Sequence, residues 1–416
     1  MLIRFCVSNF RSLREEQQFS MVAAFKEDRK DLVHVDSLGL DLLRVAGIYG
    51  ANAAGKSNLL EALRFMQAAV IESHRAWPPD GPIAREVFRL DAESRTRPSL
   101  FEADFLLEGV HFQYGFELDD KEILREWLYA FPNKRRQVWF TRDSKRPEPF
   151  QFGKQLKGSN RVIERLTRPN SLFLSAAAEN AHEALGKIYS WFSSRIYSSG
   201  AETRETRGIP FTASLLETRR KEILDLVRLA DLGIVDIKIR ERASGEPRGR
   251  AMSSGWAEGA NRVLEFRHRA KGEQVAMTLA QQSRGTQAWF SIAGLVVRAL
   301  EKGSLLCLDE IDASLHPYLV LELLQIFQDS AKNPNQAQLL FNTHDTTLLG
   351  HLLGEPGLHR DQIWFVEKNE EGASHVYPLS DFKPRKQENI ERGYLQGRYG
   401  AIPFIDVHKL TEQREG

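Results

Sequence analysis

The sequence predicts an α/β fold in which a mixed sheet with flanking helices is joined to an antiparallel β-meander and a helical insertion. Three observations lead to this prediction. A glycine-rich loop at 50–57 lies between an apolar run at 42–49, typical of a buried strand, and apolar residues at helical spacing from Leu59 onward. A second apolar run, at 304–308, ends in two acidic residues. Apolar residues also alternate along 101–118, as in a β-hairpin.

The loop at 50–57 reads GANAAGKS and matches the phosphate-binding pattern G-x-x-x-x-G-K-[ST]. A chance glycine turn is the alternative, and the strand before the loop and the helix after it disfavour that alternative. Backbone N–H groups of such a loop point at phosphate oxygens. Lys56 is expected to reach the outer phosphates of a nucleoside triphosphate, and Ser57 to supply a hydroxyl to Mg²⁺. The expected nucleotide contacts are Gly50, Asn52, Gly55, Lys56, Ser57 and Asn58.

Two acidic residues, Asp309 and Glu310, follow the apolar run at 304–308. The run is typical of a buried parallel strand, and ligands of α/β sheets bind at the carboxyl ends of such strands. We expect Asp309 to hold Mg²⁺, directly or through water, and Glu310 to orient or deprotonate the attacking water. An acidic pair after a strand is, on its own, more often the start of a solvated loop. The upstream phosphate-binding loop favours the catalytic interpretation.

A second helix N-terminus is predicted at Ser283 and Gly285, which precede a helical pattern at 288–300. Helix N-termini bind anions through their free N–H groups and the helix dipole. The sequence therefore predicts another anion-binding end, far along the chain from the first.

Two further residues lie after buried runs near the acidic pair. Asp312 opens a short loop before Pro317, and proline suits the first turn of a helix. His344 follows an apolar run at 338–342 that is typical of a strand. A histidine at this place is suited to sensing or polarising the terminal phosphate of a nucleotide.

This ordered set of motifs resembles the ABC-type ATPase heads of the SMC, RecF and OLD group. It is more closely similar to the RloA-like AAA-type ATPases found beside restriction and phage-defence genes. The corresponding motifs are Walker A at 50–57, the signature at 283–287, Walker B at Asp309 and Glu310, the D-loop at Asp312 and the switch histidine at His344. The opening 9–12 and the tail segments 361–367 and 397–404 also resemble the RloA-like pattern. The resemblance thins between about 151 and 280.

The resemblance implies a P-loop NTPase of the ABC-ATPase head type with ATP and Mg²⁺ as cofactors, and it implies the roles of the matched residues: Lys56, Glu310 and His344 in catalysis, and Ser283, Gly285 and Asp312 at the nucleotide. In that group, the signature of one protomer completes the nucleotide site of the other. A homodimer or higher oligomer held together by ATP is therefore expected. Arg284 and Thr286 depart from the Leu-Ser-Gly-Gly-Gln signature of transporters. No residue is assigned as the glutamine that couples Mg²⁺ to conformational change in other ABC heads.

Composition limits the other classes of function. The chain of 416 residues has 57 Lys and Arg against 56 Asp and Glu, so DNA binding would need a local basic patch. Its only cysteines, Cys6 and Cys307, lie in apolar strand-like runs, which disfavours disulfides and cysteine-based metal sites. We find neither a signal peptide nor about 18 consecutive apolar residues, so we expect a cytoplasmic protein without a membrane partner.

We expect three parts along the chain. An N-terminal ATPase lobe at 1–150 would carry Walker A and the β-meander. A helical insertion with returning strands would occupy 151–270. A C-terminal ATPase lobe at 271–416 would carry the signature, Walker B, the switch histidine and the tail.

The insertion carries the weakest signals. Residues 171–232 have a helical pattern that is too short and irregular for a long coiled coil, and 241–256 is predicted to be a loop. Basic clusters at 219–221 and 267–271, and Arg248 with Arg250, offer contacts to nucleic-acid phosphates. Solvated surface faces are the favoured interpretation of these clusters.

The sequence therefore predicts an ATPase subunit that dimerises around ATP and regulates a partner effector in phage defence or DNA repair. The resemblance implies an effector of nuclease or TOPRIM-like type encoded beside it. An OLD-like nuclease acting on DNA itself is one alternative, disfavoured because little of the chain follows Asp381. The nucleotide-binding subunit of an ABC transporter is the other, disfavoured because the signature lies much farther from Walker A than in transporter heads.

Overall fold

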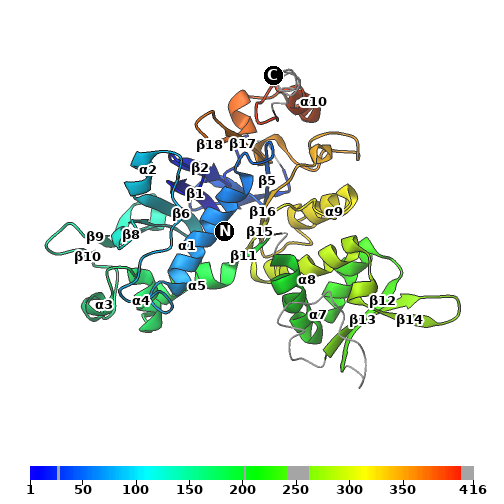
Figure 1. Cartoon of the computed structure of the whole chain (residues 1–416), viewed down its shortest axis with the longest axis horizontal. Helices are drawn as coiled ribbons and strands as arrows, with labels where there is room; N and C mark the ends of the chain where they lie inside the picture. Colours follow the sequence, from blue (N-terminus) through cyan, green and yellow to red (C-terminus); the bar gives the residue numbers. More distant parts are fainter. Residues whose placement is uncertain (26–28, 201–202, 242–261, 404–416) are drawn as a thin grey trace, which may run out of the picture.

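A six-stranded mixed sheet forms the centre of the molecule (Figure 1). The computed structural model describes residues 1–25, 29–200, 203–241 and 262–403. The strand order of this sheet is β11 (Ile196–Ser199), β15 (Leu305–Leu308), β16 (Gln338–Asn342), β5 (Val45–Tyr49), β17 (Ile363–Lys368) and β18 (Ser374–Pro378). Neighbouring strands are parallel except for β17 and β18, which are antiparallel. The predicted mixed sheet is thus confirmed.

The pairing register of β15, β16 and β5 brings the carboxyl ends of these three strands to one edge of the sheet. Leu308 of β15 pairs with Phe341 of β16, and Asn342 pairs with Ile48 of β5. All residues of these three strands are buried, as their continuous apolar runs predict for a parallel sheet covered on both faces. The segments after β5, β15 and β16 therefore emerge side by side.

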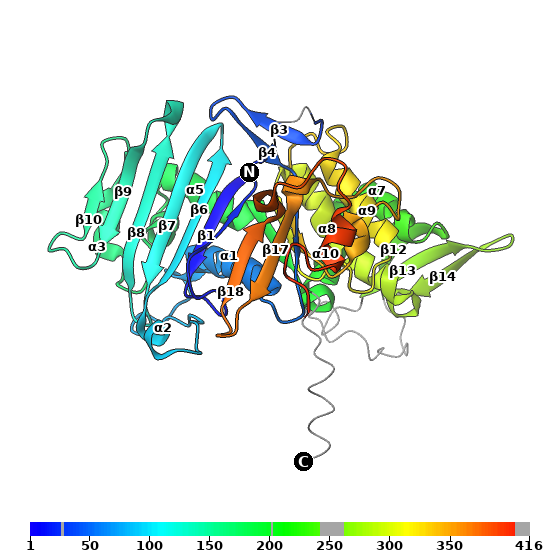
Figure 2. The same ribbon diagram turned by 90° about the horizontal axis from the view of Figure 1, so that it is seen from above.

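A seven-stranded antiparallel sheet lies beside the central sheet (Figure 2). Its order is β10 (Phe150–Phe152), β9 (Gln137–Asp143), β8 (Ile123–Phe131), β7 (Val110–Leu118), β6 (Ser99–Leu107), β1 (Leu2–Ser8) and β2 (Gln17–Ser20). Glu108 and Gly109 link β6 to β7 with φ of 50° and 77°, the left-handed backbone that a two-residue hairpin turn requires. The predicted hairpin and meander are confirmed.

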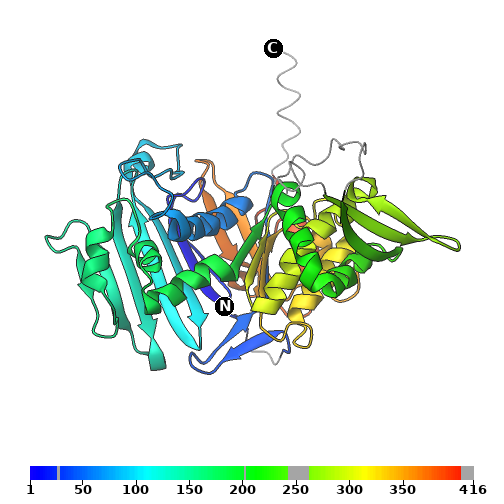
Figure 3. The same cartoon turned by 90° about the horizontal axis from the view of Figure 1, so that it is seen from below.

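Helices divide between two hydrophobic cores. Figure 3 shows α1 (Lys56–Glu72) and α5 (Glu183–Arg195) lying across one face of the seven-stranded sheet. In the core beneath them, Trp191 of α5 stacks on Phe105 of β6. The helices α7 (Ile209–Ala230), α8 (Arg284–Lys302) and α9 (Pro317–Gln328) pack with the central strands in the second core. The shorter helices are α2 (Ala92–Thr96), α3 (Asn160–Leu166), α4 (Phe173–Glu179) and α10 (Ile390–Leu395).

Two smaller sheets were not predicted as such. A hairpin of β3 (Leu32–Val35) and β4 (Leu40–Leu43) precedes β5, so the single strand expected at 42–49 is in fact two strands separated at Arg44. β12 (Ile234–Glu241), β13 (Arg262–Arg269) and β14 (Gln274–Thr278) form an antiparallel sheet. From the sequence, a return to strand is expected only at 263–267, within β13. The expected loop at 241–256 lies, apart from Glu241, outside the described residues.

The helical pattern expected over 171–232 is interrupted by one strand. β11 joins the central sheet at its edge, parallel to β15, with Ser199 paired to Leu308. Four residues are too few for a hydrophobic period to be recognised. The division at 1–150, 151–270 and 271–416 stays a prediction. Among the described helices, none has the length and apolar character needed to cross a membrane.

Candidate active site

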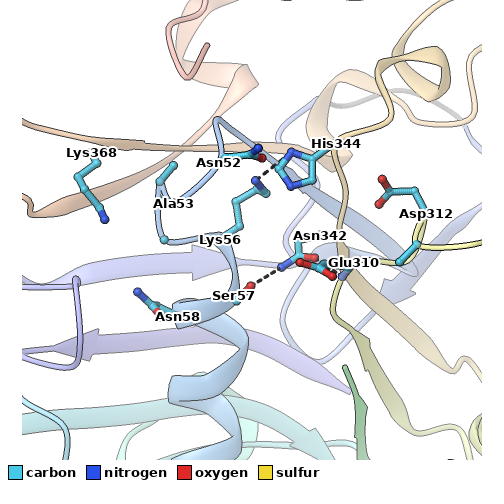
Figure 4. Close-up of a pocket in the computed structure, with 13 residues that line it drawn as sticks. Asn52, Ala53, Lys56, Ser57, Asn58, Glu310, Asp312, Asn342, His344 and Lys368 are labelled. Atoms are coloured by element: carbon cyan, nitrogen blue, oxygen red, sulfur yellow. Dashed lines mark hydrogen bonds between the residues drawn. The ribbon is translucent and has the colours of Figure 1, made fainter. Parts of the chain in front are cut away.

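A pocket of about 740 Å³ opens at the edge where β5, β15 and β16 end (Figure 4). It is lined by Asn52, Ala53, Ala54, Gly55, Lys56, Ser57, Asn58, Glu310, Asp312, Ala313, Asn342, His344 and Lys368. The phosphate-binding loop, Glu310 and His344, which are far apart in the sequence, thus face one cavity, and Asp309 contacts it through Ser57.

The loop has a backbone shape that two glycines permit. Gly50 and Gly55 have φ of 155° and 108°, and a Cβ on Gly50 would lie 2.2 Å from the carbonyl oxygen of Val366. Gly55 is the N-cap of α1 and supplies no side-chain cap, so the first N–H groups of the helix stay available to an anion. The loop therefore presents the N-terminus of α1 to the pocket.

Lys56 is held inside the loop. The residue is 6% exposed, and its Nζ donates to the carbonyl oxygens of Gly50 at 2.8 Å and Ala51 at 3.0 Å. Nδ1 of His344 lies 3.4 Å from the same nitrogen. Burial lowers the pKa of Lys56 to about 8, because the charged form loses solvation. The ammonium therefore carries its charge at neutral pH and is fixed where phosphates would bind.

Ser57 and Asp309 bring two oxygen atoms to one point. The Ser57 hydroxyl donates to Oδ1 of Asp309 at 2.9 Å, and Nδ2 of Asn342 donates to the same carboxylate oxygen. A hydroxyl and a carboxylate are the hard oxygen donors that Mg²⁺ takes at nucleotide sites. The donor set therefore fits the predicted Mg²⁺, which Ser57 and Asp309 would hold.

Glu310 has a strained backbone. Its φ of 51° lies in the left-handed region, which costs a residue with a side chain about 1–3 kcal/mol. The backbone N–H of Glu310 donates to Oδ1 of Asn342, and its carboxylate is exposed to the pocket (Figure 4). Glu310 thus lines the pocket, while Asp309 faces Ser57.

Asp312 and His344 lie on the side of the pocket away from Lys368 (Figure 4). Oδ1 of Asp312 accepts a 2.8 Å hydrogen bond from the Thr343 hydroxyl, which ties the D-loop to the residue before the histidine. Burial, followed by the positive charge of Lys56, lowers the pKa of His344 below its usual range. The imidazole is therefore neutral at pH 7, with one nitrogen as donor and the other as acceptor.

Ser283 and Gly285 lie outside the described lining of this pocket. Ser283 is the N-cap of α8, and its hydroxyl accepts from the backbone N–H of Thr286 at 3.1 Å. A Cβ on Gly285 would lie 3.2 Å from the carbonyl oxygen of Ser314, so the signature runs beside the D-loop. The predicted helix N-terminus at Ser283 is confirmed, and it is exposed.

Two segments that are far apart in the sequence brace the phosphate-binding loop. Asn58, predicted as a nucleotide contact, donates through Nδ2 to the Ser12 hydroxyl at 2.6 Å. The Ser374 hydroxyl lies 2.7 Å from the same oxygen and 2.5 Å from the carbonyl oxygen of Ala54. The opening segment with Ser12 and the strand β18 with Ser374 thus hold the loop from two directions.

The basic clusters of the insertion are partly neutralised. Arg219 pairs with Glu301 and Arg267 pairs with Glu265, while Arg248 and Arg250 lie outside the described residues. These ion pairs agree with the solvated-face interpretation of the clusters. Within the described residues, no group of three or more His, Cys, Asp or Glu side chains is placed to hold a metal ion.

Sequence reasoning missed three residues of the site. Asn342 ends β16 and Lys368 ends β17, and a polar residue closing a buried strand was the available signal for both. Lys368 is exposed and lies across the loop from His344 (Figure 4). Arg204 contacts the acidic turn from the edge of the central sheet, and no sequence pattern pointed to it.

Residues 45–350 match the family described as "AAA domain, putative AbiEii toxin, Type IV TA system". No curated protein matches the chain. Similar solved structures include the SMC head domain from Thermotoga maritima, with 14% identity over 91% of this chain and 98% of that chain and a TM-score of 0.41. An Smc head bound to the C-terminal domain of ScpA from Pyrococcus furiosus has 14% identity over 92% of this chain and 97% of that chain, with a TM-score of 0.42.

The family match covers well over half of the chain. It includes the loop at 50–57, the signature helix, the acidic pair and His344. Nucleotide binding follows from this family and agrees with the pocket geometry. The chain belongs to this AAA-domain family of P-loop NTPases.

Proposed function

We propose that this protein hydrolyses ATP with Mg²⁺ in the pocket at the edge of the central sheet. One observation carries the proposal: the 2.9 Å contact between the Ser57 hydroxyl and the Asp309 carboxylate joins the two halves of the site. Lys56 and Glu310 face the same cavity. A phosphate-binding cation, a metal-binding pair and a candidate base thus stand together, which is the set that phosphoryl transfer to water requires.

Each residue has a defined task in this reaction. Lys56 exchanges its contacts with loop carbonyls for phosphate oxygens, and Ser57 and Asp309 bind Mg²⁺. Glu310 accepts a proton as water attacks the γ-phosphorus, and the bond between that phosphorus and ADP breaks. His344 and Asp312 lie beside the terminal phosphate. ATP is preferred over GTP in this proposal because of the resemblance to ATPase heads.

We further propose that the protein dimerises around ATP. Ser283 and Arg284 at the start of α8 are exposed, as are Ser314 and His316 after the acidic turn. The side-chain oxygen of Ser283 and the N-terminus of a 19-residue helix suit the terminal phosphate of a nucleotide held by a second copy. ATP is then the joint between protomers, and its hydrolysis separates them.

The dimer regulates an effector of nuclease or TOPRIM-like type in phage defence or DNA repair. Two observations support this part. The family description names a toxin of a toxin–antitoxin system, and the sequence resembles the RloA-like ATPases of defence loci. The effector is a separate protein, encoded beside this one.

The first test is ATP turnover by the purified wild type, with and without Mg²⁺, alongside Lys56→Ala. Mg²⁺-dependent turnover that Lys56→Ala lacks is expected, because the variant cannot neutralise the outer phosphates. Lys187→Ala is the control, since this exposed lysine pairs with Glu108. Turnover by Lys56→Ala at the wild-type rate would contradict the proposed site.

The second test concerns the effector. The protein encoded beside this chain is co-expressed with the wild type and with Glu310→Gln, and its nuclease activity is measured with and without ATP. A nuclease activity that depends on the nucleotide state of the ATPase is expected. Activity that is identical in every nucleotide state would contradict the regulatory role.

A further inference from the structure

A buried arginine holds the acidic turn from behind. Arg204 is 6% exposed and donates to the carbonyl oxygens of Glu310 at 2.7 Å, Ala313 at 2.9 Å and Asp309 at 3.2 Å. These three oxygens belong to one turn, 309–313, which carries the Mg²⁺ ligand and the candidate base. The guanidinium is a planar group with five N–H donors in a fixed arrangement, so one side chain can fix several oxygens at once.

The edge strand β11 determines where this arginine lies. Ser199 of β11 pairs with Leu308 of β15, and the N–H of Asp309 donates to the carbonyl oxygen of Ser199 at 2.9 Å. The backbone N–H of Arg204 donates to the carbonyl oxygen of Gly200 at 3.1 Å, and Arg204 is the first residue of the helical turn Arg204–Gly208. The register of β11 on β15 therefore places the guanidinium beside the carbonyls of the next turn.

The guanidinium binds main-chain oxygens and leaves the acidic side chains to the pocket. Burial lowers the pKa of Arg204, while the nearby carboxylates of Glu310, Asp312 and Asp309 favour its charged form. The arginine thus offsets the negative charge of this turn without pairing off the carboxylate that would receive a proton. The carbonyl oxygen that it holds most closely belongs to Glu310, whose φ of 51° is strained.

We propose that Arg204 is a positioning residue for hydrolysis, which fixes the turn 309–313 so that the Glu310 carboxylate reaches the attacking water. The proposal rests on the ATPase function proposed above. Without the guanidinium, the strained turn relaxes and Glu310 leaves its place. Lys56 and the N-terminus of α1, which bind the phosphates, are held by other contacts. Loss of Arg204 therefore lowers kcat while ATP affinity persists.

The experiment compares Arg204→Ala and Arg204→Lys with a matched pair at Arg142. Arg142 is also buried and also donates to main-chain carbonyls, those of Ser171 at 2.7 Å and Pro169 at 2.9 Å, but it lies in β9 of the seven-stranded sheet. For each variant, kcat, the dissociation constant for ATP and the melting temperature are measured. The Arg142 variants control for the loss of stability that follows removal of any buried guanidinium.

We expect Arg204→Ala to reduce kcat about 100-fold, the scale of a 1 Å displacement of a reacting group, with ATP affinity within threefold of wild type. Arg204→Lys restores part of kcat, because an ammonium reaches fewer of the three oxygens. Arg142→Ala and Arg142→Lys lower the melting temperature and keep the kcat of the folded protein. If Arg204→Ala does not fold, Arg204→Lys is compared with the wild type instead, and we expect its kcat to be about tenfold lower.

Three outcomes would overturn the inference. If Arg204→Ala and Arg204→Lys both had the kcat of the wild type, Arg204 would have no positioning role. Parallel losses of kcat and ATP binding, matched by the Arg142 variants, would show a structural role alone. Absence of turnover by the wild type would overturn the proposed ATPase function and this inference with it. Turnover by the wild type with either of the first two outcomes would overturn the role of Arg204 alone.

Discussion

The Ser57 hydroxyl donates a 2.9 Å hydrogen bond to Oδ1 of Asp309, a residue 252 positions later in the chain. Ser57 lies in the first turn of α1, and Asp309 follows β15. The pairing of β15 with β16 and of β16 with β5 brings the two residues to one edge of the sheet. The contact joins the phosphate-binding loop to the acidic turn and defines the predicted Mg²⁺ position.

Ser57→Ala removes one of the two predicted Mg²⁺ ligands. We expect Mg²⁺-dependent turnover to fall about 10–100-fold, the usual scale for a weakened metal site, while ATP binding without Mg²⁺ is unchanged. The measurement is kcat as a function of Mg²⁺ concentration. Ser194→Ala is the control, because its exposed hydroxyl on α5 donates to the carbonyl oxygen of Ser190 in the preceding turn, outside the described lining of the pocket. An unaltered Mg²⁺ requirement in Ser57→Ala would exclude the serine as a ligand.

Asn342→Ala removes the amide that links β16 to the acidic turn. Its side chain bonds both the Asp309 carboxylate and the N–H of Glu310, so Mg²⁺ binding and water attack should weaken together. We expect kcat to fall about 10–100-fold and the Mg²⁺ concentration for half-maximal rate to rise. Asn335→Ala, which removes a surface contact to the end of α8, serves as the comparison. Wild-type kinetics in Asn342→Ala would show that the turn holds without this amide.

ATP affinity should decrease above pH 8. The pKa of Lys56 is about 8 in the free protein, and bound phosphates favour its protonated form. Binding therefore takes up a proton above pH 8, and affinity falls about tenfold for each further pH unit. Titration of Glu310→Gln with ATP from pH 7 to 9.5 measures this slope without hydrolysis. His344→Ala should keep the slope, because the lowered pKa of His344 places its titration below this range. A flat profile would contradict a role for the Lys56 charge.

Ser283→Arg places a bulky cation on the exposed start of α8. We expect it to abolish ATP-dependent dimerisation and to leave ATP binding by the monomer within threefold of wild type, since Ser283 lies outside the pocket of its own chain. Solution mass with and without ATP, together with kcat, measures both effects. Ser194→Arg is the matched control on α5. Normal turnover by Ser283→Arg would contradict a site shared between two protomers.

Local patterns made much of this site predictable. The loop at 50–57 and the acidic pair each follow a buried strand, and ligands of such sheets bind at that edge, so the sequence predicts that the two segments lie together. The N-cap at Ser283 was predictable for a similar reason, because serine before an apolar helical pattern is a common helix start.

Contacts made by short or distant segments could not be predicted. β11 has four residues within a helical region, and only its pairing with β15 shows that it is a strand. Arg204 follows that strand and contacts carbonyls more than 100 positions away, so no local period marks it. Asn342 was read as part of an apolar strand, and its bonds to Asp309 and Glu310 depend on the register between β15 and β16.

The measurement that tests the central claim most directly is the solution mass of Glu310→Gln with and without ATP and Mg²⁺, alongside turnover by the wild type. Glutamine keeps the shape of the side chain but cannot accept the proton of the attacking water, so ATP should remain bound. We predict a shift from monomer to dimer or higher when ATP and Mg²⁺ are added, and turnover only by the wild type. No shift in mass, together with turnover by a monomer or by an oligomer that forms without ATP, would contradict the account.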